Sequence, residues 1–254
     1  MYAILMLGTA GSGKSTLTAR LVEWYASKGA YAITLNLDPG VIDLPYEPDV
    51  DVRSYVSIDE IMSRYRLGPN GALILASDLI ADRLDEIQRE VDELNPDYVI
   101  VDTPGQLELF AYRASGVIFA KEFRCDAKAS VFLFDPMLAN SPSNMLSISL
   151  LATSIRLRLG VAQVNVLSKI DLIKKDRLVE LIECSADPAR LEYALQREEK
   201  DSELYLLGVY ILRGLKRQGM SMGLLAVSSI TYEGMVNLAG ALARMLKEGE
   251  DVEQ

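Results

Sequence analysis

Apolar runs rich in Ile, Val and Leu recur along the chain, separated by longer segments in which hydrophobic residues follow a helical period. Strands that are apolar at every position are buried on both faces, as in a parallel sheet covered by helices. We therefore predict an α/β fold of three layers with a mostly parallel sheet. The predicted strands are residues 3–7, 32–37, 98–101, 129–134, 164–167 and 224–227.

Three of the segments between these runs have recognisable helix boundaries. Residues 15–27 end before Gly29, residues 78–94 stop before Asn95-Pro96, and residues 233–247 form the last predicted helix. The helix at residues 78–94 is expected to stop before Asn95-Pro96 because the residue before a proline disfavours helical backbone angles. Residues 38–56 contain three prolines and several acids, which predicts a functional loop.

A second irregular region covers residues 174–218, where two apolar helical segments flank a charged stretch. This pattern predicts a helical insertion between two strands. The chain has 254 residues, of which 50% are hydrophobic, and both values are ordinary for a globular protein. We expect a single domain over residues 1–254, with the insertion embedded in it.

The charge of the chain narrows the class of partner. A formal net charge of −10 would repel a phosphate backbone, so we expect no general nucleic-acid binding. The longest apolar stretches are interrupted by polar residues, and the first residues already read as a strand without a basic leader. We therefore expect a cytoplasmic protein that does not use a membrane.

The residue types that are missing also restrict the chemistry. The chain has no histidine, and its cysteines, Cys125 and Cys184, lack the spacing of a soft-metal site. Imidazole is excluded as an acid or base, so catalysis would depend on carboxylates, amides, lysine and a hard metal ion. Those groups are the parts of a phosphoryl-transfer site.

A glycine-rich motif links the first predicted strand to the first predicted helix. Residues 8–15, GTAGSGKS, match the phosphate-loop pattern GxxxxGK(S/T) in the context that this pattern requires, which predicts a P-loop NTPase fold. Backbone N–H groups would bind the phosphates, Lys14 would reach the β and γ phosphates, and Ser15 would hold Mg²⁺. The predicted nucleotide contacts are Gly11, Ser12, Gly13, Lys14, Ser15 and Thr16.

A second motif follows the strand predicted at residues 98–101. Asp102 ends that strand and is the predicted carboxylate for the metal, as in a Walker B motif. The next residues are Thr-Pro-Gly, and Gly105 offers a flexible backbone N–H that could sense a γ phosphate. Gln106 then stands where it could orient the attacking water.

A third motif predicts the base. Residues 164–171 read VNVLSKID, with Ser168, Lys169 and Asp171 at the end of a strand. An aspartate there can accept hydrogen bonds from N1–H and the amine of guanine, whereas adenine would face it with an acceptor. We therefore predict GTP and GDP as ligands, with Ser228 after the next strand as a further contact. The usual pattern is Asn-Lys-x-Asp, and Ser168 replaces its asparagine.

With these three motifs in this order, the chain resembles a P-loop GTPase. The segment Leu67-Gly68-Pro69-Asn70-Gly71 lies between the Asp-Pro-Gly segment at residues 38–40 and the DTPGQ motif at residues 102–106, and it matches the loop that names the GPN-loop GTPases. Residues 36–40, NLDPG, are similar to the Asp-Pro-Ala motif of the same family. The resemblance covers nearly the whole chain. The family it points to belongs to a dimeric class of P-loop GTPases. The compact form of this chain is similar to that of an archaeal member.

The resemblance implies a constitutive homodimer in which Asn70 enters the nucleotide site of the partner. The residues alone show only that no arginine occupies an obvious finger position to stabilise the developing charge, and the amide donor in trans that the resemblance implies would fill this gap. Asp38, Gln106 and Glu108 are candidates for placing the water, and Asp38 is a further candidate for the metal. The family also suggests a protein partner in the assembly of RNA polymerase.

Three alternative functions remain open from the sequence. A small-molecule or polynucleotide kinase would share the phosphate loop, but no acceptor pocket or arginine cluster is evident. A metal chaperone would need Cys or His clusters and a second lysine in the loop, where this chain has Thr9. A nucleotide-gated scaffold without hydrolysis would have the same motifs.

Overall fold

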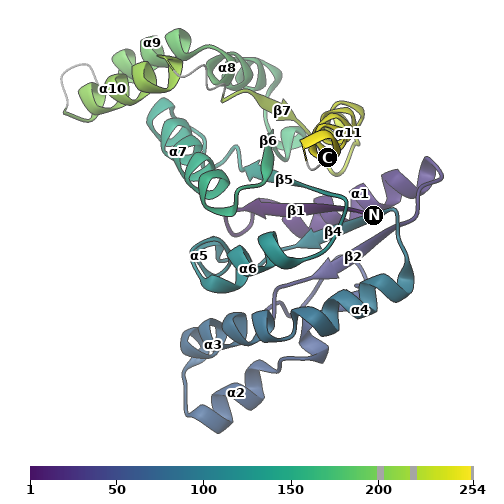
Figure 1. The fold of residues 1–254 in the computed structure, drawn as a ribbon. Coiled ribbons are helices and arrows are strands. Elements are labelled where there is room, and N and C mark those ends of the chain that lie inside the picture. The colour runs from purple at the N-terminus through teal and green to yellow at the C-terminus, as the bar shows by residue number, and fades with distance from the viewer. Residues whose placement is uncertain (199–202, 218–221, 253–254) are drawn as a thin grey trace.

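A seven-stranded sheet forms the centre of the molecule, with strand order β3-β2-β4-β1-β5-β6-β7 (Figure 1). The computed structural model describes residues 1–198, 203–217 and 222–252. Within this part every strand pairing is parallel, and the predicted α/β P-loop fold is confirmed. The strands are β1 Tyr2–Gly8, β2 Ala32–Asn36, β3 Val50–Asp51, β4 Tyr98–Asp102, β5 Ala127–Phe134, β6 Ala162–Leu167 and β7 Leu224–Ala226.

Helices cover both faces of this sheet. Among the described residues they are α1 Lys14–Ser27, α2 Ile58–Tyr65, α3 Pro69–Asp82, α4 Leu84–Leu94, α5 Leu107–Ala111, α6 Ala114–Glu122, α7 Pro142–Leu159, α8 Lys175–Ala186, α9 Pro188–Glu198, α10 Glu203–Arg217 and α11 Met235–Val252. Short 3₁₀ turns lie at Val52–Ser54 and Ile170–Leu172. None of the described helices is long and apolar enough to cross a membrane.

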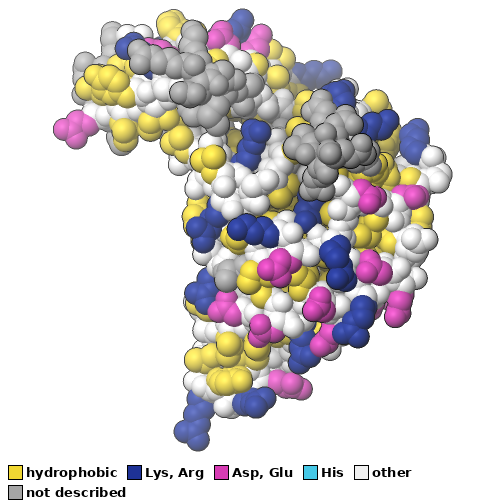
Figure 2. All heavy atoms as spheres, in the orientation of Figure 1, with side chains coloured by type: hydrophobic (Ala, Val, Ile, Leu, Met, Phe, Trp, Pro, Cys, Tyr) yellow, Lys and Arg dark blue, Asp and Glu magenta, His cyan; other side chains and the backbone are white. Residues whose placement is uncertain are grey.

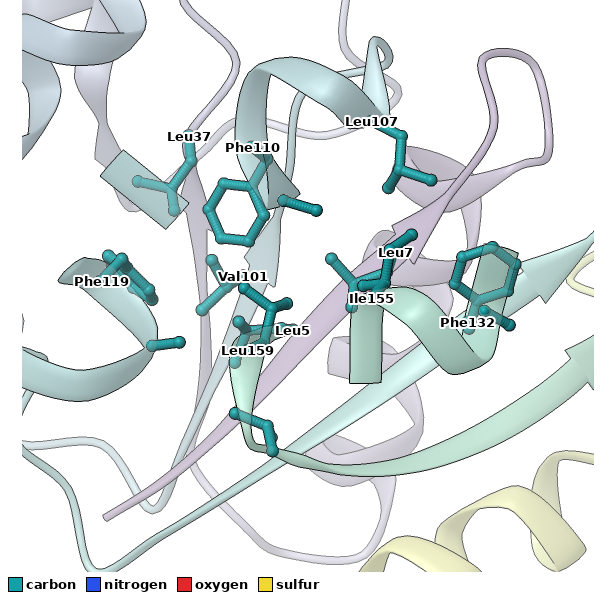
Figure 3. Close-up of a cluster of buried hydrophobic side chains, with 14 of the residues drawn as sticks. Leu5, Leu7, Leu37, Val101, Leu107, Phe110, Phe119, Phe132, Ile155 and Leu159 are labelled. Carbon is teal, nitrogen blue, oxygen red and sulfur yellow. The ribbon is translucent and has the colours of Figure 1, made fainter. Parts of the chain in front are cut away.

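The uninterrupted apolar pattern of β1 reflects burial on both faces. Ile4 and Met6 belong to a core cluster with side chains of α1 and α11, while Leu5 and Leu7 belong to a second cluster on the opposite face. Figure 3 shows this second cluster, where Leu5 and Leu7 lie close to aromatic and aliphatic side chains of α5, α6 and α7. Alternate residues of one strand therefore anchor two helical layers.

The helix predicted at residues 78–94 is wrong in its extent. The structure has two helices there, α3 and α4, which meet at Arg83, and α3 begins at Pro69. Proline is favoured at the first helical position because its missing N–H has no partner to lose there. The helical backbone is interrupted at Arg83, with φ −101° and ψ 6°, and buried side chains of both helices belong to the same core cluster. The Gly-Pro-Asn segment therefore opens a helix.

The loop predicted at residues 38–56 contains a short strand that was not expected. β3 pairs with the end of β2 through Leu35 with Val50 and Asn36 with Asp51. This pairing returns the chain to the sheet after the irregular residues 37–49. The loop is therefore closed at both ends by the sheet.

The segment between β6 and β7 is helical, as predicted, and consists of α8, α9 and α10. These helices lie at the opposite end of the sheet from α2 and α3 (Figure 1). The predicted end of the insertion at residue 218 lies outside the described residues.

Candidate nucleotide site

The predicted motifs meet at one edge of the sheet. A cavity of about 410 Å³ lies where the chain leaves the carboxyl ends of β1, β2, β4 and β6. Parallel strands present their carboxyl ends at the same edge, which is where open α/β sheets bind ligands. The cavity is lined by Gly11, Gly13, Lys14, Ser15, Thr16, Asp38, Val41, Leu44, Asp102, Thr103, Gly105 and Lys169.

The phosphate loop has the backbone that its glycines permit. Gly13 has φ 94° directly before α1, a left-handed conformation that disfavours residues with a Cβ. A Cβ at Gly8 would lie 2.9 Å from the carbonyl oxygen of Leu133, so the loop and β5 approach too closely for any side chain. α1 has no acidic residue in its first turn, and its N-terminal N–H groups are suited to an anion.

The ammonium group of Lys14 is held inside this loop. Its Nζ donates to the carbonyl oxygens of Gly8 at 3.0 Å and Thr9 at 3.2 Å. Burial lowers the pKa of Lys14, while the nearby carboxylates of Asp102 and Asp38 raise it in part. Its position in the cavity lining is suited to contact with phosphate oxygens.

Asp102 has the environment expected of a metal-binding carboxylate. It is 2% exposed at the end of β4, and its Oδ2 accepts a hydrogen bond of 2.9 Å from the hydroxyl of Tyr46. Its Oδ1 is buried and has no hydrogen-bond partner among the described residues. Burial raises the pKa of Asp102, and the hydroxyls of Ser15 and Tyr46 lower it without cancelling that effect.

These groups fit a magnesium ion. A buried oxygen without a partner needs an explanation, and a cation beside the Ser15 hydroxyl would supply one. Mg²⁺ is commonly held by one or two carboxylates together with substrate phosphates. Within residues 1–198, 203–217 and 222–252 no group of three or more Cys, Asp or Glu is arranged as a metal site.

Asp38 joins the loops that follow β2 and β4. Its Oδ1 accepts a hydrogen bond of 2.9 Å from the N–H of Gly40, and its Oδ2 accepts one of 3.1 Å from the N–H of Gly105. Asn36 orients it in turn, because its Oδ1 accepts from the Asp38 N–H at 3.0 Å. Asp38 thus lies in the cavity lining next to the glycine expected to sense the γ phosphate, and its roles toward the metal and the water stay predictions.

Three predicted catalytic residues lie outside the cavity lining. Gln106 precedes α5, Glu108 lies in the first turn of α5, and Asn70 lies in the first turn of α3. All three side chains are exposed. The structure of one chain therefore does not bring them to the phosphate loop, and their catalytic roles stay predictions.

The base-reading motif is attached directly to the phosphate loop. The Ser168 hydroxyl lies 2.8 Å from the carbonyl oxygen of Ser12 and 3.1 Å from that of Phe134, both within hydrogen-bond distance. Lys169 bonds to the carbonyl oxygen of Gly11 and to Asp135 Oδ2, the latter at 2.8 Å. Serine at the asparagine position of the motif thus still links the two loops.

Asp171 and Ser228 lie side by side, and neither belongs to the lining of the cavity. The Ser228 hydroxyl donates to Asp171 Oδ1 at 2.6 Å, and the Asp171 side chain is exposed. The Ser228 oxygen also accepts from the N–H groups of Ile230 and Thr231 at 3.2 and 3.1 Å. A fixed serine therefore orients the carboxylate that we predict to read the base.

Sequence reasoning missed three side chains that support this site. Tyr46 gave no signal beyond lying in the proline-rich loop, whereas Asp135 follows β5 in the way that Asp102 follows β4 and could have been found by that rule. Arg53 was also missed. It pairs with Asp51, and its Nη1 donates to the carbonyl oxygen of Val41 at 3.1 Å, so it supports the loop from outside.

A phosphate loop between a strand and a helix, with a buried carboxylate at the end of the neighbouring strand, defines the class of P-loop nucleotide-binding proteins. A family model described as "Conserved hypothetical ATP binding protein" matches residues 6–248. The chain is 32% identical over 238 positions to GPN-loop GTPase PAB0955 of Pyrococcus abyssi, with 92% of this chain and 93% of that protein covered. It is 30% identical over 266 positions to GPN-loop GTPase 1 of Schizosaccharomyces pombe, with 98% of this chain and 70% of the relative covered.

One of these relatives also has a solved structure that is similar to this chain. The crystal structure of PAB0955, described as a GTPase in apo form, matches with a TM-score of 0.86 at 30% identity and covers 96% of this chain and 97% of its own. The chain belongs to the GPN-loop GTPase family. The predicted family and the predicted enzyme class, a GTPase, are confirmed.

Proposed function

We propose that this protein binds GTP in the 410 Å³ cavity and hydrolyses it to GDP and phosphate with Mg²⁺. The observation that carries the proposal is the buried Asp102 carboxylate, whose Oδ1 lacks a partner, in a cavity that Ser15 and Lys14 also line. Lys14 would contact the β and γ phosphates, and Ser15 and Asp102 would hold the metal. The metal would neutralise charge on the phosphates when bound.

The position of the catalytic water is proposed from the residues that line the cavity. Asp38 is the only one of the predicted water-placing residues in the lining, and its link to the Gly105 N–H would transmit γ-phosphate contact to the loop before Gln106. Phosphate release in a single turnover, measured in Mg²⁺ and in EDTA, tests the proposal. Release that requires Mg²⁺ supports it, and no release over hours would favour the nucleotide-gated scaffold.

We also propose that two copies of the chain form the complete enzyme. Exposed apolar side chains lie in the loops that leave the carboxyl edge of the sheet around the cavity, at Ile42, Met137, Leu138, Leu172 and Ile230. Ile42 is 87% exposed, and apolar side chains that gather on one exposed surface mark protein contacts. A second copy facing this rim would bring exposed donors such as Asn70 toward the nucleotide.

Complementation between inactive variants tests this arrangement. Asn70→Ala and Lys14→Ala each lose hydrolysis alone, but a mixed dimer retains one site with an intact Lys14 that receives Asn70 from the partner. An equimolar mixture that exchanges subunits should recover about a quarter of the wild-type activity, because half of the dimers are mixed and each has one working site. Asn237→Ala, at an exposed asparagine of α11, is the matched control and should keep full activity. A mixture as inactive as its components would contradict donation in trans.

We further propose that the enzyme acts on protein partners, and the family resemblance suggests the assembly of a transcription complex. The support is an apolar surface on α9 and α10, where Tyr193, Leu206, Leu207 and Tyr210 are each more than half exposed (Figure 2). Surfaces of this kind mark protein contacts. Leu207→Asp should lose co-purification with RNA polymerase subunits while keeping GTP hydrolysis. Unchanged co-purification would contradict the proposal that α10 binds the partner.

A further inference from the structure

The loop between β2 and β3 contacts both the nucleotide cavity and Asp102, the carboxylate proposed to bind the metal. Val41 and Leu44 of this loop line the nucleotide cavity. Tyr46, from the same loop, donates its hydroxyl hydrogen to Asp102 Oδ2 at 2.9 Å. The two residues are separated by 56 positions in the chain, so this contact depends on the tertiary fold.

The loop that carries Tyr46 is fixed on both sides of that residue. Before it, the Asp38 carboxylate accepts a hydrogen bond from the Gly105 N–H. The Arg53 guanidinium donates to the carbonyl oxygen of Val41 at 3.1 Å, and the ion pair of Arg53 with Asp51 places this arginine beside β3. These contacts limit where the Tyr46 hydroxyl can lie.

The two oxygens of Asp102 differ in their hydrogen bonding because of Tyr46. Oδ2 has the phenol as a partner, whereas Oδ1 is buried without one. A carboxylate with one oxygen held by a neighbouring donor cannot rotate freely, and its second oxygen keeps a defined direction. Groups that orient a metal ligand in this way typically contribute about 10- to 100-fold to metal affinity.

We infer that Tyr46 is a positioning residue for the divalent cation of the GTPase site, acting by fixing the Asp102 carboxylate. The inference rests on the proposed function, because it requires Mg²⁺ at Ser15 and Asp102. Metal binding at Asp102 would also affect the loop of residues 37–49, because the hydrogen bond from Tyr46 joins this loop to the carboxylate that binds the metal. Tyr46 contacts neither nucleotide nor water in this role.

The test measures Mg²⁺ dependence of nucleotide retention and needs no hydrolysis. Release of GDP carrying a fluorescent methylanthraniloyl group is followed at a series of free Mg²⁺ concentrations. For Tyr46→Phe, the Mg²⁺ concentration that half-maximally slows release should rise about tenfold, the size expected for one lost hydrogen bond to a charged group. In EDTA its release rate should stay within about twofold of the wild type, because the phosphate loop is unchanged.

Tyr55→Phe is the matched control. The Tyr55 hydroxyl also donates to a carboxylate, Glu90 Oε2 at 2.5 Å, but neither residue lines the nucleotide cavity. Its Mg²⁺ dependence should equal that of the wild type. A Tyr46→Phe midpoint within about twofold of the wild type would overturn the inference, because loss of an orienting bond must be visible there.

Two other outcomes separate the inference from the proposed function. Faster release by Tyr46→Phe in EDTA, with an unchanged Mg²⁺ midpoint, would give Tyr46 a purely structural role and overturn the inference alone. Release from the wild type that does not depend on Mg²⁺ would overturn the proposed metal site, and the inference with it.

Discussion

Replacing Lys14 with alanine is expected to lower single-turnover GTP hydrolysis by at least about 100-fold, equivalent to roughly 3 kcal/mol in the barrier. Lys14 is 6% exposed and lines the cavity, so its charge acts on the phosphates where water screens it little. Phosphate release measured with enzyme in excess over GTP gives the rate of the chemical step. The effect is large because negative charge builds on the transferred phosphoryl group during the reaction.

The fold should survive the loss of Lys14. The variant loses two hydrogen bonds to carbonyl oxygens of the loop, but it also removes a charge whose burial is unfavourable, as the lowered pKa of Lys14 indicates. Thermal unfolding without nucleotide should therefore change little. Lys28→Ala, at the exposed end of the same helix, is the control and should hydrolyse GTP like the wild type. If Lys14→Ala retained hydrolysis within about threefold, the proposed phosphate site would be wrong.

Asp171→Asn is expected to weaken GTP binding by about 100-fold and to improve binding of xanthosine triphosphate. The asparagine amide would place a donor against the amine of guanine, while the carbonyl at the same position of xanthine could accept from it. Ser228 orients the present carboxylate through a hydrogen bond of 2.6 Å, so the exchange acts on a fixed group. Equilibrium competition of GTP, xanthosine triphosphate and ATP measures the change.

The control for this substitution is Asp176→Asn, which changes an exposed aspartate in the first turn of α8. It removes the same charge without touching the base-reading loop and should leave the order of preference intact. GTP binding by Asp171→Asn that equals the wild type, together with effective competition by ATP in both proteins, would favour the kinase alternative.

The buried strands of this protein could be predicted because they are apolar at every position. The six predicted strands match observed ones to within about two residues at each end, the usual uncertainty of such boundaries. β3 was missed because two residues carry no periodic pattern, and its pairing with β2 depends on a distant part of the chain. Residues 78–94 were predicted as one helix because the local pattern does not show the break between α3 and α4 at Arg83.

The candidate site also contains residues that the sequence could predict and residues that it could not. Lys14, Ser15 and Asp102 could be named because each belongs to a motif at a strand end, and parallel strands bring such ends together. Because Ser168 stands where the guanine-binding motif usually has asparagine, the sequence alone gave only a weak match to that motif. In the structure the Ser168 hydroxyl contacts the Ser12 carbonyl oxygen, so serine can link this motif to the phosphate loop. Tyr46 has no motif, and only the path of its loop places it on Asp102.

By itself, the sequence determined the α/β class, the phosphate loop and the order of the nucleotide motifs, because these depend on local spacing and burial. The tertiary structure decided which side chains meet across the cavity: Asp38 with Gly105, Ser168 with Ser12, and Tyr46 with Asp102. Those contacts join segments far apart in the chain, and their geometry follows from packing of the whole sheet. The exposed position of Gln106 outside the cavity lining is likewise a property of the fold, since its motif predicted a place beside the phosphates, whereas Asn70 was expected in the nucleotide site of a partner.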